Sequence, residues 1–132
     1  MNSGPAPTDE KPGLPLLLQT IAMPADTNPA GDIFGGWLLS QMDLAGAVAA
    51  RAQVGGRLAT VAVESMKFHR PVLVGDLVAS HGAVVRIGRT SIAVRVEIWV
   101  HRAEHSAPLK VTEGIYTYVA IDADRRPRVI GS

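Results

Sequence analysis

Residues 31–56 read GDIFGGWLLSQMDLAGAVAARAQVGG and decide the fold, because they contain the one convincing helix of the chain. Leucine, methionine, alanine and glutamine favour helix from Phe34 to about Val54. Asp32 is the expected N-cap, and Gly55-Gly56 end the helix. Between Asp32 and Arg51 the only ionisable side chain is Asp43. A helix so apolar is expected to be buried nearly all round.

Strands are expected on both sides of this helix. A short apolar segment, residues 14–21, precedes it, and a turn-rich loop at residues 23–32 joins the two. Four antiparallel strands are expected after the helix, at residues 60–70, 77–87, 90–101 and 109–121. A hairpin turn at Gly88-Arg89 joins the second and third of these strands. In residues 90–101 an isoleucine or valine stands at every second position from Ile92 to Val100, which predicts one face toward the core and one toward a wetter environment. The pattern predicts an α+β fold with one long central helix wrapped by a five-stranded antiparallel sheet.

The length of 132 residues fits one domain. Residues 1–13 contain three prolines and little to bury, so we expect a disordered tail before a single domain at 14–128. Residues 129–132 form a short C-terminal tail. The unpaired edge of the predicted sheet favours self-association.

Composition narrows the function classes. Thirteen basic and twelve acidic residues give a net charge of +1, which is not typical of nucleic-acid binding. The absence of cysteine excludes disulfides, thiolate metal sites and a cysteine nucleophile. Four histidines lack metal-ligand spacing, so we expect no metal. No apolar run is long enough to span a membrane and no secretory signal is present, so we expect a cytoplasmic protein.

Asp43 is the residue most suggestive of chemistry. At helical spacing its neighbours are small or uncharged, and no cation lies three or four residues away. A carboxylate in such surroundings is costly unless it is hydrogen-bonded, and one that lines a narrow slot is a candidate general base. The alternative is structural, because a buried aspartate can simply accept hydrogen bonds from a neighbouring turn.

The loop before the helix is a second candidate feature. Residues 31–36 bring glycine-rich backbone to a helix N-terminus, where free N–H groups suit a phosphate or an oxyanion. The alternative is that Gly35-Gly36 only allow close packing. Lys67, Arg70 and Arg89 fall near a strand end and a hairpin, where they could contact a phosphorylated small molecule. Their alternative is ordinary solvated surface charge.

Five stretches together resemble one known family. They are Ala22-Met-Pro-Ala-Asp-Thr-Asn28, Gly31-Asp-Ile-Phe-Gly-Gly-Trp37, Ser40-Gln-Met-Asp43, Thr60-Val-Ala-Val-Glu64, and Arg70-Pro71 with Val74-Gly-Asp76. They are similar to the hotdog-fold acyl-CoA thioesterases of the bacterial YciA type, from about residue 14 to about 128. The resemblance implies a hotdog fold and hydrolysis of acyl-CoA to a free acid and CoA.

The resemblance also implies roles for individual residues. Asp43 would be the general base or the nucleophile, Asn28 would orient the thioester or water from the facing subunit, and the amide of Gly35 or Gly36 would receive the thioester oxygen. The expected catalytic set is therefore Asp43, Asn28 and Gly36. CoA is expected to contact Gly35, Lys67, Arg70, Gly88, Arg89, Thr90 and Ser91. CoA belongs to substrate and product, so no separate cofactor is expected. Dimers assembled into hexamers are implied, with sites between subunits.

Two other functions fit the same sequence less well. A dehydratase or hydratase of the same fold typically uses an active-site histidine, and residues 23–54 contain none. A non-enzymatic acyl-CoA sensor would usually carry a DNA-binding domain, for which 132 residues leave no room.

Overall fold

The computed structural model describes residues 11–131, apart from the side chains of Ser65 and Met66. Most of the expected tail at residues 1–13 therefore lies outside the described residues, as does Ser132. The described chain forms five strands, one short 3-10 helix and one long helix. They are β1 (Leu16–Ile21), η2 (Pro24–Asp26), α1 (Gly35–Val54), β2 (Arg57–Phe68), β3 (Leu77–Ile87), β4 (Ser91–His101) and β5 (Leu109–Ile121).

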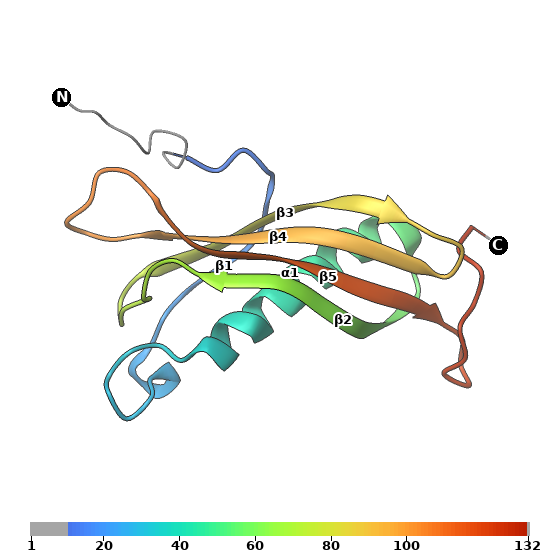
Figure 1. Ribbon diagram of the computed structural model, residues 1–132, viewed down its shortest axis with the longest axis horizontal. Coiled ribbons are helices and arrows are strands. Elements are labelled where there is room, and N and C mark those ends of the chain that lie inside the picture. Colours follow the sequence, from blue (N-terminus) through green and yellow to red (C-terminus); the bar gives the residue numbers. More distant parts are fainter. Residues whose placement is uncertain (1–10, 132) are drawn as a thin grey trace.

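One antiparallel sheet with the strand order β1-β3-β4-β5-β2 lies along α1 (Figure 1). The core lies between them: Leu38, Met42 and Ala45 of α1 are buried against apolar side chains of β4 and β5. The expected architecture of one long helix and five antiparallel strands is thus confirmed. Because β1 and β2 form the two edges, β2 is free to pair on its outer side.

Expected boundaries were wrong at the helix cap and at both ends of β2, which ends at Phe68 rather than Arg70. Asp32 does not cap α1: the N-cap residue is Phe34, and no side chain caps the helix there. The backbone amide of Asp32 instead donates to the side chain of Asn28, so the loop continues to Phe34. β2 starts at Arg57 rather than Thr60, because Gly55 and Gly56, with φ of 75° and 71°, turn the chain straight into the sheet.

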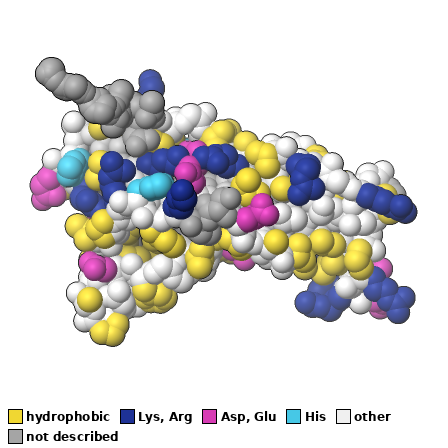
Figure 2. Space-filling model, in the orientation of Figure 1, with side chains coloured by type: hydrophobic (Ala, Val, Ile, Leu, Met, Phe, Trp, Pro, Cys, Tyr) yellow, Lys and Arg dark blue, Asp and Glu magenta, His cyan; other side chains and the backbone are white. Residues whose placement is uncertain are grey.

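The expectation that α1 is buried nearly all round was also wrong for the single chain. Its sheet-facing side is buried, but Leu44 and Val48 remain 58% and 49% exposed. Val61 and Val63 of the edge strand β2 are exposed as well. Hydrophobic side chains accordingly gather along the side of the molecule formed by α1 and β2 (Figure 2). Within residues 11–131, no helix is long and apolar enough to cross a membrane.

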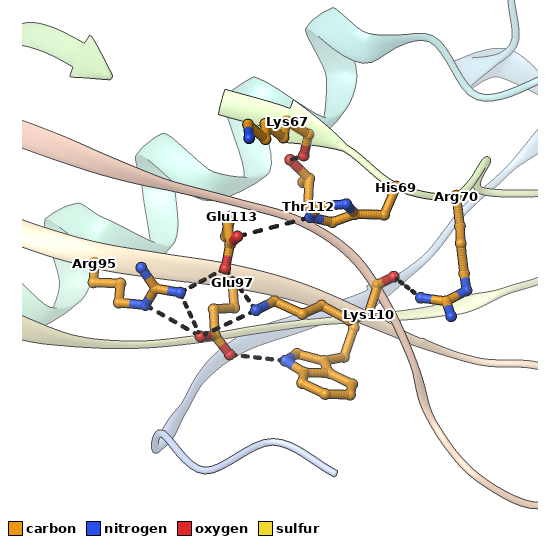
Figure 3. Close-up of polar contacts among 9 residues, drawn as sticks. Lys67, His69, Arg70, Arg95, Glu97, Lys110, Thr112 and Glu113 are labelled. Atoms are coloured by element: carbon orange, nitrogen blue, oxygen red, sulfur yellow. Dashed lines mark hydrogen bonds and ion pairs between the residues drawn. The ribbon is translucent and has the colours of Figure 1, made fainter. Parts of the chain in front are cut away.

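The outer face of β4 is not the wetter face that alternation suggested. Glu97 is only 8% exposed, and it accepts hydrogen bonds from Arg95 at 3.2 Å and from the Trp99 indole at 3.0 Å. Arg95 and Lys110 also pair with Glu113 on the neighbouring strand (Figure 3). Glu97 can be buried here because it is paired with groups of opposite charge, so its polarity alone did not reveal its burial.

This ion-pair network predicts an acid-sensitive contribution to stability. The hydrogen bond from Lys110, with the charges of Lys110 and Arg95, lowers the pKa of Glu113 below its ordinary value of 4.5 against the opposing effect of burial. A carboxylate whose pKa is lower in the folded than in the unfolded state stabilises the fold at pH values above its unfolded-state pKa. This stabilisation is lost as the pH falls through the folded-state pKa. In the Glu113→Gln variant the free energy of unfolding is therefore expected to decrease less than in the wild type as the pH is lowered. Urea unfolding from neutral pH to about pH 3 measures it, with the exposed Glu104→Gln as control. An unchanged pH slope in Glu113→Gln would contradict the assignment.

Candidate active site

Asp43 lies in the middle of α1, half-buried, on the side that faces β2. The hydroxyl of Thr60 on β2 donates to its Oδ1 at 2.7 Å. The strand therefore holds the carboxylate through this oxygen. Both readings of Asp43 gain support, since the side chain is satisfied structurally and still lines two clefts.

Three clefts follow one another along α1. The helix-start cleft, about 430 Å³, is lined by residues that include Asn28, Gly35, Phe68 and Arg70. The central cleft, about 450 Å³, is lined by Leu39, Ser40, Asp43, Thr60, Val63, Phe68 and Tyr116. The arginine cleft, about 460 Å³, holds Asp43 and Thr60 at one end, together with Arg51 and Arg57. Asp43 and Thr60 thus stand between two clefts of the size typical for small ligands.

The start of α1 offers hydrogen-bond donors, as the glycine-rich loop suggested. The amides of Gly35 and Gly36 come before the helix's own bonding begins, and no acceptor for them occurs among the described residues. Gly35 lies against the ring of Phe68, where an added Cβ would be 3.5 Å from the nearest ring carbon. The two glycines therefore fit both interpretations, because they allow close packing and also leave backbone N–H donors available to an oxyanion.

Asn28 shapes the loop that leads to these donors. Its Oδ1 accepts hydrogen bonds from the amides of Ala30 at 2.9 Å and Asp32 at 3.1 Å. The side-chain oxygen is thus used within the loop. The Nδ2 group makes no hydrogen bond among the described residues, so Asn28 retains a donor toward the helix-start cleft.

The two halves of the candidate catalytic set are far apart in one chain. Gly36 and Asp43 are seven residues apart in the helix, which places them about 10 Å apart along its axis. One thioester carbonyl cannot touch both at once. A single protomer therefore presents a carboxylate half around Asp43 and a donor half around Asn28 and Gly36.

The residues expected to contact CoA also fall into two groups. Lys67 is exposed at the end of β2, and Arg70 donates through Nη1 to the Lys110 carbonyl at 2.7 Å. The β3–β4 hairpin consists of Gly88, Arg89, Thr90 and Ser91. The amide of Gly88 donates a hydrogen bond to the carbonyl of Ser91 across this turn. Ser91 pairs with Val119 of β5, and Val119 pairs in turn with Ala59 of β2. Ala59 lies eight residues before Lys67 on β2. That separation is about 26 Å along the strand.

Sequence reasoning gave no role to Thr60, Tyr116 or Tyr118. Tyr116 and Tyr118 of β5 donate to the carbonyls of Leu39 and Asp43 at 3.0 and 2.8 Å. The sequence did contain one signal for the two tyrosines. They are two residues apart on a strand, so their side chains lie on the same face of the sheet. Two tyrosines on a core-facing side need hydroxyl partners, and α1 was the only element opposite.

The chain is similar to known proteins over most of its length. The family model described as the thioesterase superfamily matches residues 30–103. The acyl-CoA thioester hydrolase YciA of Salmonella typhimurium is 50% identical over 124 residues, covering 91% of this chain and 92% of that protein.

Solved structures agree with the sequence relatives. HI0827, described as a hexameric broad-specificity acyl-coenzyme A thioesterase, is 46% identical with a TM-score of 0.86, covering 92% of this chain and 84% of the other. Cj0915, a hexameric hotdog-fold thioesterase of Campylobacter jejuni, is 43% identical with a TM-score of 0.83, covering 90% and 91%.

Proposed function

The chain belongs to the thioesterase superfamily, and we propose that it hydrolyses acyl-CoA thioesters to a carboxylic acid and CoA, with Asp43 as the acting carboxylate. The resemblance read from the sequence and the hotdog fold are both confirmed by these relatives. The observation that carries the role of Asp43 is its geometry. A carboxylate held by Thr60 on one oxygen lies at the junction of two clefts.

The chemistry needs three groups at the thioester. Water attacks the carbonyl carbon and gives its proton to the carboxylate of Asp43, while the carbonyl oxygen becomes an oxyanion. Backbone amides of the Gly35-Gly36 type stabilise that oxyanion. Its collapse breaks the carbon–sulfur bond, and the departing thiolate takes the proton from Asp43 and leaves as CoA. In the alternative route the Asp43 carboxylate attacks the carbonyl carbon and expels the CoA thiolate, which leaves an anhydride. Water then cleaves the anhydride and restores the carboxylate.

A second copy of the chain completes the site in this proposal. Because about 10 Å separates Gly36 from Asp43 within a protomer, the donor half must come from another copy to reach the same carbonyl. The exposed apolar residues of α1 and the free edge of β2 support such pairing, since an exposed edge strand readily adds a further strand. The hexameric relatives support the same conclusion, and we propose a homo-oligomer with Asn28 and Gly36 facing the partner's Asp43.

The clefts divide the substrate between an apolar and a charged part. The central cleft is lined mainly by apolar groups such as Leu39, Val63 and Phe68, and it suits the acyl chain. Lys67 and Arg70 lie about 26 Å from the β3–β4 hairpin, so we assign these two expected groups of CoA contacts to different copies. The pairing of Arg70 with the Lys110 carbonyl leaves its other guanidinium donors for phosphate.

Thiol release tests the proposed function directly. Purified protein is expected to liberate free CoA from a series of acyl-CoA thioesters of increasing chain length, because the central cleft accepts apolar chains. Thiol titration measures the release. Hydration of an enoyl-CoA, followed in the same samples, separates a hydratase from a thioesterase. Binding of acyl-CoA without thiol release or hydration would contradict the proposal and indicate a binding protein.

A further inference from the structure

Tyr116 and Tyr118 attach β5 to α1 at two points one helical turn apart. Both side chains are 1% exposed, and their hydroxyls donate to the carbonyls of Leu39 and Asp43. Two residues along a strand advance about 6.7 Å, and four residues along a helix advance about 6 Å. The spacing of the two tyrosines along the strand therefore matches the spacing of the two carbonyls along the helix. The second hydrogen bond, from Tyr118, is made to Asp43, the residue that carries the acting carboxylate.

The contact at Tyr118 depends on a glycine in the helix. A Cβ added to Gly46 would lie 2.2 Å from the Tyr118 hydroxyl oxygen and 3.1 Å from the nearest ring carbon. No side chain other than hydrogen leaves room for this hydroxyl. Since glycine is a poor residue for a helix interior, its presence one turn after Asp43 is accounted for by the approach of Tyr118.

The same hydroxyl also lies close to the Asp43 carboxylate. Burial first, and then the carboxylate through its charge and as a hydrogen-bond acceptor, raises the pKa of Tyr118 far above its ordinary value. The hydroxyl therefore stays protonated and remains a donor. Tyr118 lines the arginine cleft together with Asp43 and Thr60, so three side chains from two strands and the helix meet at this point.

We propose that Tyr118 is a positioning residue for Asp43 and that Gly46 is present to let its hydroxyl reach the helix. The inference rests on the proposed function. Thr60 holds the carboxylate from β2, while Tyr118 fixes the backbone that carries it from β5. A catalytic group needs such support, because a displacement of about 1 Å can cost about 100-fold in rate.

Tyr118→Phe tests the role of the hydroxyl. We expect kcat for acyl-CoA hydrolysis to fall about tenfold with KM unchanged, because the carboxylate moves while the clefts keep their shape. Thr112→Val is the matched control: it removes another buried hydroxyl of β5, whose acceptor is the Lys67 carbonyl. Its Tm is expected to fall while kcat stays at the wild-type value. A Tyr118→Phe variant with wild-type kcat, or with kcat lowered only as far as in Thr112→Val, would overturn the inference.

Gly46→Ala provides an independent test. Alanine is the better helix former, yet we expect kcat to fall at least tenfold because the new methyl group displaces the hydroxyl. Adding Tyr118→Phe removes the 2.2 Å contact, so the double variant is expected to be no slower than Gly46→Ala alone. Losses that multiply would show that the two residues act separately, and would overturn the inference.

An Asp43→Asn background separates this inference from the proposed function. If Tyr118 acts through Asp43, Tyr118→Phe will not lower the residual rate of Asp43→Asn further. A further tenfold loss would mean that Tyr118 acts elsewhere. Absence of thiol release by the wild type, or full activity of Asp43→Asn, would refute the proposed function itself. An active wild type, an inactive Asp43→Asn and a normal Tyr118→Phe would refute only the positioning role.

Discussion

Asp43→Asn is expected to lower kcat/KM for acyl-CoA hydrolysis by at least about 100-fold, in the range of losing a general base. Asparagine has nearly the same shape and keeps an oxygen that can accept the Thr60 hydroxyl, so the contact at 2.7 Å survives. What disappears is the negatively charged carboxylate, which takes the proton of water or attacks the thioester. The substitution therefore tests the chemistry of the site while leaving its packing in place.

Two further measurements make this result interpretable. Asp124→Asn removes the same charge from an exposed residue of the C-terminal turn and is expected to hydrolyse acyl-CoA at the wild-type rate. The molar mass of Asp43→Asn in solution should equal that of the wild type, since Asp43 is held within its own chain by Thr60. A correctly assembled Asp43→Asn that keeps wild-type kcat/KM would refute the role of Asp43.

The helix and the strands could be predicted because their signals are local. The alternation of residues 90–101 predicts a strand, and β4 occupies Ser91–His101. The apolar composition after Phe34 predicts a helix, and α1 occupies Gly35–Val54. What this local pattern could not show is the partner of each buried face. Leu44 and Val48 look like core residues in the sequence, yet they are exposed in the single chain.

The candidate site was only partly predictable for a related reason. Asp43 stands out as the single acidic residue in an apolar helix, so the sequence alone indicates it as a candidate. Thr60 and Tyr118 carry no such signal, because their contact with Asp43 depends on how β2 and β5 pair and where α1 crosses them. Asp32 was misjudged as a cap because the side chain of Asn28 holds its amide in the loop.

Asn28 offers a substitution that keeps the loop and removes only the donor. Aspartate retains the oxygen that accepts the amides of Ala30 and Asp32, while the Nδ2 donor is lost and a negative charge is added. A negative charge beside a developing oxyanion opposes its formation. If Asn28 faces the partner's thioester, Asn28→Asp is inactive alone, with a loss of about 100-fold or more. The fold and the assembly are unaffected.

Mixed oligomers of Asn28→Asp and Asp43→Asn are expected to regain activity that neither parent has. If each site takes Asn28 from one copy and Asp43 from another, random mixing gives about a quarter of the sites both native residues. Co-expression with two different tags, tandem purification and thiol titration measure the recovered rate. The parents mixed after separate purification, without subunit exchange, should stay inactive. Recovery requires a site that crosses the interface, because a site within one chain would always contain one of the substitutions. Mixed oligomers as inactive as their correctly assembled parents would place Asn28 and Asp43 in the same subunit's site, or remove one of them from catalysis.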